Sequence, residues 1–499
     1  MNLASLIAAH PDAAPAILSA NEVTTYGALR AQVAALRGGL AALGVEPDDR
    51  VGLMLASNWY FVAAYLAVLG SGAIAVPLNP QSPTAELSAE LASVRPKVVV
   101  VGPTAADAFA KVDRSCVGIA TVLVPHGVDL ADALSFEDLL VSEPAPIVDR
   151  PSDAPAVLLF TSGTAGAPKA AVLTHGNLLS NIAQAQASSG NAVVASDVVL
   201  GALPLFHVYG LNAVLGRALA AGALTVLVQR FDPASSVATV RDRGVSLIAG
   251  VPLMFDAWVR LDDGEATRAV FATVRAAASG GARLDPSVAA AFQKRFGVAI
   301  GEGYGLTEAA PIVTAALQPN PVPGTVGRPI PGVEVRIVDE NGDDTVAGDA
   351  GEIWVRGPNV FPGYWNDAEA TARALTPEGW LRTGDIAVID DDGELTIVDR
   401  VKDLIIVSGF NVYPAEVEEV LAGHPGVAEV AVVGVPHPHT GESVKAFVVA
   451  KPDRALEEDE VIAYCGTYLA RYKCPSKVLF VRDLPHGVAG KILRRELKM

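Results

Sequence analysis

Nine consecutive residues, Thr161 to Lys169 (TSGTAGAPK), hold three hydroxyl side chains, two glycines and one lysine. Glycine lets backbone N–H groups approach an anion closely, hydroxyl groups donate further hydrogen bonds, and lysine adds a positive charge. These are the components of a phosphate-binding loop, and an ordinary turn stays open as the alternative. The segment differs from the phosphate-binding pattern GxxxxGK[ST], because Ala170 follows Lys169.

An aromatic ring and a carboxylate lie close together in GEGYGLTEAAP (301–311), downstream of the glycine-containing segment SGGARL (279–284). Tyr304 is flanked by two glycines, which leave a ring face free to stack on a heterocycle. Glu308 follows four residues later, and a carboxylate beside a polyphosphate suits Mg²⁺. The structural alternatives are a core tyrosine and a helix-capping glutamate.

A third segment combines an aspartate and an arginine. Asp385 is expected on a glycine turn after a strand, and Arg400 is expected at the end of a later strand. An aspartate that faces two sugar hydroxyls, supported by an arginine, is suited to binding ribose. A turn aspartate with a surface salt bridge is the alternative.

Two isolated residues complete the candidates. Lys491 follows Gly490 in LPHGVAGKILRREL, and a lysine on an exposed loop can reach a cleft and neutralise charge that develops on a carbonyl and a phosphate. His207, in LPLFHVYG, is a candidate active-site histidine. A solvated lysine and a satisfied core histidine are the alternatives.

The elements that must position these residues alternate along most of the chain. Short apolar runs rich in valine and isoleucine alternate with Ala/Leu segments of helical period, which predicts parallel strands covered by helices and an α/β fold. The expected strands are 51–55, 73–78, 97–102, 156–160, 223–228 and 245–250.

The pattern changes from about residue 329. Strands at 333–339, 351–357 and 393–400 are separated by Asp-Gly and Gly-Pro turns, which favours an antiparallel sheet or a small barrel. After residue 401 the pattern predicts a compact α+β unit with a helix at 414–424. We therefore expect an N-terminal domain at 1–400 and a C-terminal domain at 401–499.

Composition limits the class of partner and compartment. The chain has 499 residues and a net charge of −18, which disfavours nucleic-acid binding. Three cysteines, Cys116, Cys465 and Cys474, show no metal-ligand spacing and suit a reducing compartment. The start has no cationic signal-peptide region, and the longest apolar stretch contains Arg217. We expect a cytoplasmic protein without a transmembrane segment, and the sequence leaves a homodimer open.

Taken in order, TSGTxGxPK, SGGA, GYGLTE, TGD, DRxKD and GKILRREL resemble the motifs of the adenylate-forming superfamily, which contains acyl-CoA synthetases, nonribosomal adenylation domains and luciferases. The resemblance spans essentially the whole chain. It implies two α/β subdomains plus a small β-barrel in the N-terminal domain, and a mobile C-terminal lid. It also implies a reaction in which a carboxylate attacks the α-phosphate of ATP and a thiol then displaces AMP from the acyl-adenylate.

The resemblance implies a role for each motif residue. The catalytic set is Lys491, Glu308, Thr164 and His207, with Glu308 holding Mg²⁺ and Lys491 bridging carboxylate and α-phosphate. Rotation about Lys402 withdraws Lys491 and brings in the loop of Gly409, which forms the coenzyme A channel. The nucleotide residues are Thr161, Ser162, Gly163, Thr164 and Lys169 for the β- and γ-phosphates, Gly280, Gly281, Tyr304 and Gly305 around adenine, Thr307 at the α-phosphate, and Asp385 and Arg400 at the ribose.

The identity of the acid depends on the residues expected around its pocket. Amino-acid-activating relatives have an aspartate where this chain has His207, which argues against an amino acid. The expected lining is apolar, which favours an acyl chain or an aromatic acid over a dicarboxylate, and we prefer a fatty or medium-chain acid. The lining comprises Phe206, Val208, Tyr209, Leu211, Val251, Met254, Phe255 and Leu306.

Other functions remain open at this stage. A malonyl-type ligase needs a cation such as Arg283, and an aryl acid–CoA ligase needs only a different pocket shape. A fatty acyl-AMP ligase that loads a carrier protein, or a catalytically silent acyl or nucleotide sensor, would use the same motifs. Coenzyme A is the preferred acceptor.

Overall fold

The computed structural model describes residues 1–161, 169–188, 192–262, 268–316, 321–400, 403–407, 410–438, 440–452, 454–469, 471–487 and 492–497. Their contacts define two compact units, each described by itself. The first unit consists of Met1–Gly280, Leu284–Glu334 and Val355–Leu381. The second consists of Gly281–Arg283, Val335–Trp354 and Arg382–Met499.

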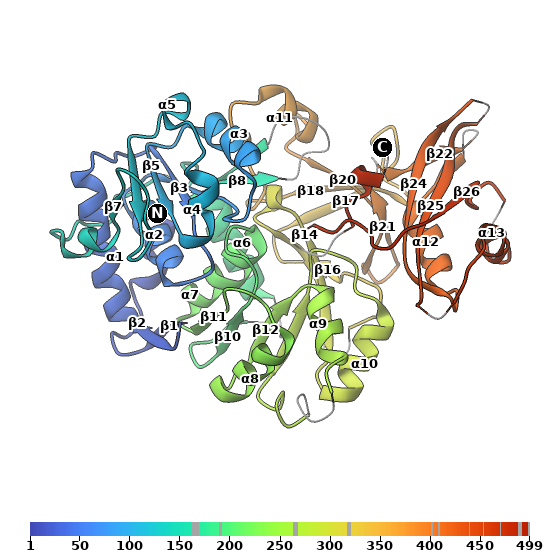
Figure 1. Cartoon of the computed structure of the whole chain (residues 1–499), viewed down its shortest axis with the longest axis horizontal. Coiled ribbons are helices and arrows are strands. Elements are labelled where there is room, and N and C mark those ends of the chain that lie inside the picture. The colour runs from blue at the N-terminus through green and yellow to red at the C-terminus, as the bar shows by residue number, and fades with distance from the viewer. Residues whose placement is uncertain are drawn as a thin grey trace. The chain divides into compact units, whose positions relative to one another are not determined.

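One sheet of the first unit has the order β19-β9-β8-β4-β3-β5-β6-β7. Strand β9 pairs antiparallel with both β8 and β19, and the other neighbouring strands pair in parallel. Helices cover both faces (Figure 1), which explains why its strands are apolar on both sides. The strands are β3 (Arg50–Met54), β4 (Ile74–Pro77), β5 (Val98–Val101), β6 (Thr121–Val124), β7 (Leu134–Ser135), β8 (Pro155–Thr161), β9 (Lys169–Thr174) and β19 (Gly363–Tyr364). The helices around it are α1 (Tyr26–Ala42), α2 (Trp59–Gly70), α3 (Thr84–Val94), η2 (Pro103–Ala105), α4 (Ala106–Phe109), α5 (Arg114–Val117), η3 (Glu137–Val141) and α11 (Ala368–Ala374).

The second sheet of this unit has the order β16-β15-β14-β13-β12-β10-β11-β1-β2, and β10, β11, β12, β13 and β14 are parallel. Its strands are β1 (Pro15–Ser19), β2 (Glu22–Thr25), β10 (Val198–Gly201), β11 (Leu224–Leu227), β12 (Leu247–Gly250), β13 (Ala276–Ser279), β14 (Ile300–Gly305), β15 (Ile312–Ala315) and β16 (Arg328–Pro329). Its helices are α7 (Arg217–Ala221), α8 (Pro233–Arg243), α9 (Pro252–Val259) and α10 (Pro286–Phe296). All six predicted α/β strands are therefore confirmed.

An aromatic core fills the helical side of this second sheet. The Trp258 ring is fully buried, and its centroid lies 5.6 Å from that of Phe255 and 5.9 Å from that of Phe271. The sequence placed Phe255 in the acid pocket, and that prediction is wrong, because the side chain is 0% exposed within this core. Met254, buried in the same core, is a second correction.

Helix α6 (His175–Ala187) joins the two sheets of the first unit. It starts directly after β9 with a capping box, in which the Thr174 hydroxyl accepts from Asn177 N and the Asn177 side chain accepts from Thr174 N, both at 3.0 Å. The predicted phosphate-binding segment is thus followed by a strand before the helix begins, unlike a P-loop.

The second unit contains two further sheets. A four-stranded sheet has the order β17-β18-β20-β21. This sheet confirms the expected change in the strand pattern after residue 329. A five-stranded sheet has the order β23-β22-β25-β24 with β26 paired to β25, and α12 and α13 pack on it. The strands are β17 (Glu334–Val338), β18 (Gly351–Arg356), β20 (Leu381–Ile389), β21 (Leu395–Arg400), β22 (Ile405–Val407), β23 (Phe410–Val412), β24 (Val427–His437), β25 (Gly441–Ala450) and β26 (Lys477–Phe480). The helices are α12 (Pro414–Ala422), α13 (Glu458–Gly466) and η7 (Arg494–Leu497).

The architecture agrees with the predicted fold class, an α/β body and a small α+β C-terminal part. The domain boundary at residue 400 stays a prediction, since the contact-based unit also takes in the four-stranded sheet. Among the described helices, none is both long and apolar enough to span a membrane.

A buried histidine at the start of α6 makes stability depend on pH. His175 is 0% exposed, its Nδ1 accepts from Leu3 N at 3.1 Å, and desolvation lowers its pKa to about 4. Because the unfolded chain binds this proton near pH 6.5, His175 contributes stability at neutral pH that is lost as the pH falls from 6.5 to 4.

Replacing His175 with asparagine keeps an acceptor for Leu3 N and removes the titration. We expect the difference in unfolding free energy between the two proteins to change by about 2 kcal/mol between pH 7 and pH 5. Urea unfolding at both pH values measures this change. Parallel losses of stability in both proteins would contradict the assignment.

Candidate active site

The predicted acid and adenine segments meet at one edge of the nine-stranded sheet. Strands β10, β12, β13 and β14 are parallel, so their carboxyl ends lie at the same edge. The segments that leave β10, β12 and β13 carry Phe206 and His207, Val251, and Gly280, and Tyr304 lies near the carboxyl end of β14. A carboxyl edge of this kind is the usual ligand site of an α/β sheet.

The SGGA turn packs directly on the aromatic ring of Tyr209. A Cβ atom on Gly280 would lie 3.2 Å from the Tyr209 ring, so the glycine permits this close approach. The Tyr209 hydroxyl donates to Ala278 O at 3.5 Å, and desolvation raises the Tyr209 pKa. Gly281 has φ +81°, a left-handed conformation that favours glycine. Both glycines shape the turn, and their predicted place beside the adenine stays a prediction.

Tyr304 and Gly305 end β14 where it pairs with β15. Tyr304 is half-buried, so it is not the core residue that the structural alternative required. A Cβ atom on Gly305 would lie 2.0 Å from Pro311 O, so glycine is needed for the close approach of the two strands. Thr307 and Glu308 follow in the short helix η5 (Thr307–Ala309), and both are half-buried.

Glu308 is brought together with two residues from remote segments. The Tyr364 hydroxyl donates to Glu308 Oε1 at 2.7 Å, and Lys169 Nζ lies 5.6 Å from the Tyr364 ring centroid. Strand β19 aligns Tyr364 with Ala171 of β9, two residues after Lys169. Sequence analysis missed Tyr364; its only signal was an aromatic residue after glycine in GYWND. The carboxylate and the lysine of two predicted motifs therefore share one neighbourhood.

The phosphate-binding segment connects two paired strands. Thr161 ends β8, Lys169 begins β9, and the two residues are cross-strand partners. Ala170, which follows Lys169, is buried and its carbonyl accepts from Trp365 N at 2.8 Å. The predicted residues Ser162, Gly163 and Thr164 lie outside the described part of the chain.

His207 borders the acid side of the same sheet edge. Solvent reaches its side chain, yet the surrounding protein desolvates the ring and lowers its pKa. The Phe206 ring centroid lies 5.9 Å from the His207 ring centroid. Its exposure shows that it is not a satisfied core residue. Leu211 and Val208 are buried, so they contribute packing behind this edge.

In the second unit, Asp385 and Arg400 are cross-strand partners of β20 and β21. Asp385 was expected on a turn after a strand; it instead lies within β20, where Gly384 adopts φ +70° and keeps the strand locally irregular. Asp385 N donates to Thr383 Oγ1 at 3.1 Å. The pairing places the two predicted ribose residues opposite each other on neighbouring strands.

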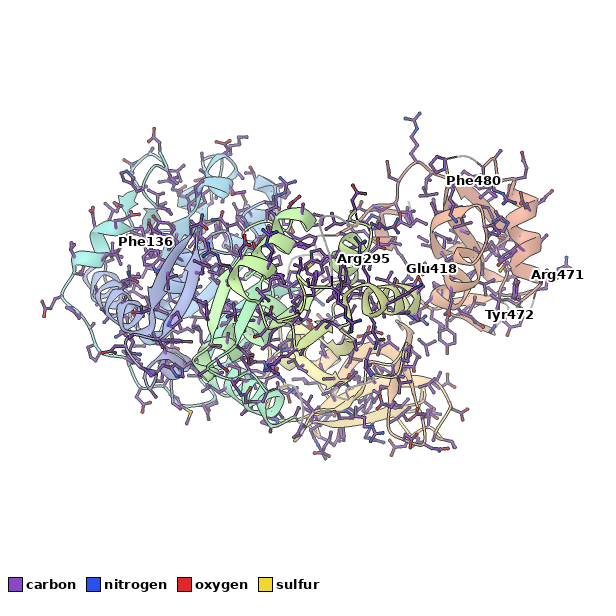
Figure 2. The ribbon with its side chains drawn as sticks, turned by 90° about the horizontal axis from the view of Figure 1, so that it is seen from below. Phe136, Arg295, Glu418, Arg471, Tyr472 and Phe480 are labelled. Atoms are coloured by element: carbon purple, nitrogen blue, oxygen red, sulfur yellow. The ribbon has the colours of Figure 1, made fainter. Side chains whose placement is uncertain are left out.

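The C-terminal tail is anchored by a half-buried ion-pair cluster in the second unit. Arg494 donates to Glu418 Oε2 at 2.5 Å and to Asp403 Oδ2 at 3.3 Å, and these carboxylates raise its pKa. Glu418, which Figure 2 labels, lies on α12. Arg494 is therefore structural. Lys402, Gly409 and Lys491 lie outside the described residues.

The described residues offer few ligands for a divalent cation. In the described part of the chain, no group of three or more His, Cys, Asp or Glu side chains is arranged to hold a metal. Glu308 offers one carboxylate, with Oε1 engaged by Tyr364. Mg²⁺ in phosphate sites commonly takes one or two carboxylates and completes its shell with phosphates and water. Glu308 therefore fits a cation that arrives with a nucleotide.

A lysine, a carboxylate and a glycine turn beside the carboxyl edge of a parallel sheet are suited to binding a nucleotide. Residues 4–365 match the AMP-binding enzyme family, and residues 416–491 match the AMP-binding enzyme C-terminal domain. The chain therefore belongs to the AMP-binding enzyme family. This confirms the predicted membership of the adenylate-forming superfamily.

Relatives define the class within this family. The chain is 38% identical to a long-chain-fatty-acid–CoA ligase from Yersinia pestis, covering 97% of this chain and 91% of the relative. It is 36% identical to a feruloyl-CoA synthase from Amycolatopsis sp, covering 97% and 95%. The fold matches ATP-bound MatB from Rhodopseudomonas palustris with a TM-score of 0.92 and 33% identity, covering 100% and 98%. The chain is an acyl-CoA synthetase, an enzyme class whose substrates are ATP and coenzyme A.

Proposed function

We propose that this acyl-CoA synthetase activates a fatty or medium-chain carboxylic acid to an acyl-adenylate and transfers the acyl group to coenzyme A. The single observation that carries the proposal is the shared neighbourhood of Glu308, Tyr364 and Lys169 beside the carboxyl edge of the nine-stranded sheet. A cation and a carboxylate placed together suit a polyphosphate with its divalent ion.

The proposed nucleotide contacts are those that the motif resemblance implies. Thr161 and Lys169, with Ser162, Gly163 and Thr164, bind the β- and γ-phosphates. Glu308 would hold Mg²⁺, and the cation would neutralise negative charge on the phosphates. Gly280, Gly281, Tyr304 and Gly305 border the adenine, Thr307 contacts the α-phosphate, and Asp385 and Arg400 bind the ribose.

The acid site is proposed to be apolar. Phe206, Tyr209, Val251 and Leu306 are half-buried, whereas the other predicted lining residues are core. Arg283, the cation that a dicarboxylate would need, donates to Glu419 Oε2 at 3.1 Å. This pairing favours a monocarboxylate over a malonyl-type acid.

The two half-reactions need different arrangements of the C-terminal domain. Lys491 neutralises charge on the carboxylate and α-phosphate during adenylation, and the same cleft then has to admit a thiol. Rotation of residues 401–499 about Lys402 withdraws Lys491 and brings the Gly409 loop to the thiol channel. A cytoplasmic location fits the cysteine content, and a homodimer stays a prediction.

Pyrophosphate release tests the proposal. The purified chain is incubated with ATP, Mg²⁺ and octanoate, palmitate, benzoate, ferulate or malonate, with and without coenzyme A. We expect the highest rates with octanoate or palmitate and a thioester product that requires coenzyme A. Highest rates with benzoate or ferulate would replace the fatty acid with an aryl acid, and highest rates with malonate would overturn the apolar site.

Two further outcomes separate the remaining alternatives. Acyl-AMP that accumulates without thioester in the presence of coenzyme A would identify an acyl-AMP ligase that loads a carrier protein. Absence of pyrophosphate release with every acid would support a nucleotide or acyl sensor. The match to curated acid–CoA ligases over nearly the whole chain favours the thioester product.

A further inference from the structure

The turn that presents Glu308 is held at five successive backbone carbonyls. Three of the donors are amide side chains from distant parts of the chain, so tertiary contacts fix this turn. The pairs are Glu308 O with Phe361 N (2.9 Å), Ala309 O with Asn359 Nδ2 (2.8 Å), Ala310 O with Asn212 Nδ2 (2.8 Å), Pro311 O with Leu306 N (3.1 Å), and Ile312 O with Asn181 Nδ2 (2.8 Å).

The middle of this turn has an unfavourable backbone conformation. Ala310 is fully buried and has φ +63°, a left-handed conformation that a residue with a Cβ rarely adopts. Such a conformation persists only where the surroundings enforce it. The Asn212 side chain donates to Ala310 O, so this amide binds directly to the residue with the unfavourable backbone conformation.

Asn212 lies on the acid side of the site. It belongs to η4 (Tyr209–Gly216), a π-helix in which Arg217 N donates to Asn212 O, five residues earlier. A π-helix is rare and is frequent at functional sites. Two residues separate its first residue, Tyr209, from Phe206.

Two glycines of the π-helix allow the close packing around the Asn212 side chain. A Cβ atom on Gly216 would lie 2.8 Å from Asn212 Oδ1, so the glycine leaves room for the side chain. A Cβ atom on Gly210 would lie 2.3 Å from Pro204 O, so a second glycine fixes the helix against the segment that carries Phe206. Asn212 itself is 1% exposed, and its Nδ2 also reaches Leu178 O at 3.2 Å.

We infer that Asn212 is a positioning residue that ties the acid-side π-helix to the turn of Glu308, so that the acid site and the metal–nucleotide site are held in one geometry. Of the three amide side chains on the turn, Asn212 alone comes from the segment that also carries His207 and Tyr209. The inference rests on the proposed role of Glu308 toward Mg²⁺.

Calorimetric binding of ATP provides the test, in the absence of any acid and therefore of turnover. The dissociation constant for ATP is measured in EDTA and in Mg²⁺, and the EDTA value divided by the Mg²⁺ value reports how much affinity the cation adds. We expect Asn212→Leu, which has a similar volume and no donor, to reduce this ratio about tenfold. Affinity in EDTA should change less, since Glu308 contributes little without the cation.

Gln184→Leu is the matched control. Gln184 is a buried amide on α6, and neither its Nε2 nor its Oε1 has a hydrogen-bond partner among the described residues. The Gln184→Leu protein should keep the wild-type ratio of ATP dissociation constants. Asn212→Ser, which is smaller and cannot reach Ala310 O, serves if Asn212→Leu does not fold.

The outcomes separate this inference from the proposed function. A wild-type chain that binds no ATP, or binds it equally with Mg²⁺ and EDTA, would refute the proposed role of Glu308. A wild-type Mg²⁺ effect that a folded Asn212 variant retains within twofold would overturn the positioning role. An equal loss in Gln184→Leu would overturn it as well, because general damage to the core would then explain the change.

Discussion

Replacing Glu308 with glutamine should lower the rate of pyrophosphate release by about 100- to 1,000-fold, the usual loss when one electrostatic contact to a transition state is removed. Glutamine has nearly the same shape and keeps an oxygen that can accept from the Tyr364 hydroxyl, which donates to Oε1 at 2.7 Å. The change therefore removes the negative charge and leaves the packing in place. Initial rates with octanoate or palmitate at several Mg²⁺ concentrations measure the effect.

Glu369→Gln is the matched control for this prediction. Glu369 is an exposed carboxylate of α11 that pairs with Arg373 one turn away, and exposed pairs of this kind contribute little. This variant should keep the wild-type rate. A Glu308→Gln protein within fivefold of the wild type, with an unchanged Mg²⁺ requirement, would show that the carboxylate does not hold the cation.

Replacing Lys491 with alanine should reduce acyl-adenylate formation by at least 100-fold and leave thioester formation from synthetic acyl-adenylate nearly unchanged. The physical reason is that Lys491 neutralises charge only while the carboxylate and the α-phosphate react. Single-turnover assays of each half-reaction separate the two effects. Arg494, three residues later, is held by Glu418 and Asp403, so the anchor of this tail persists in the variant.

Lys451→Ala controls for the loss of a lysine from the C-terminal part. Lys451 is exposed and donates to Pro425 O at 3.0 Å, away from the predicted motifs. Both half-reactions should proceed at the wild-type rate in this variant. Equal losses of adenylation and thioester formation in Lys491→Ala would refute the proposed division of labour.

Local sequence alone determined the elements and the fold class. Valine-rich runs such as 97–102 are apolar on both faces, and a strand of that kind is stable only inside a parallel sheet. The predicted strands therefore match the observed ones closely, and the motif order identified the superfamily. These features depend on side-chain period and residue type, which a linear sequence displays directly.

Residue roles that depend on distant contacts were not predictable. Phe255 was assigned to the acid pocket because it is apolar, yet helix packing around Trp258 places it in the core. Tyr364 was not considered, because nothing near it in sequence indicates that β19 will pair with β9 beside Glu308.

The sequence by itself determined which chemical groups this enzyme has and in what order they occur. Tertiary structure alone decided which of them meet: Lys169, Glu308 and Tyr364 lie far apart in the chain and come together through strand pairing. The amide of Asn212 reaches the turn of Glu308 across 98 residues. Side-chain type is a local property, whereas a contact over such a separation exists only after the sheets and helices have packed.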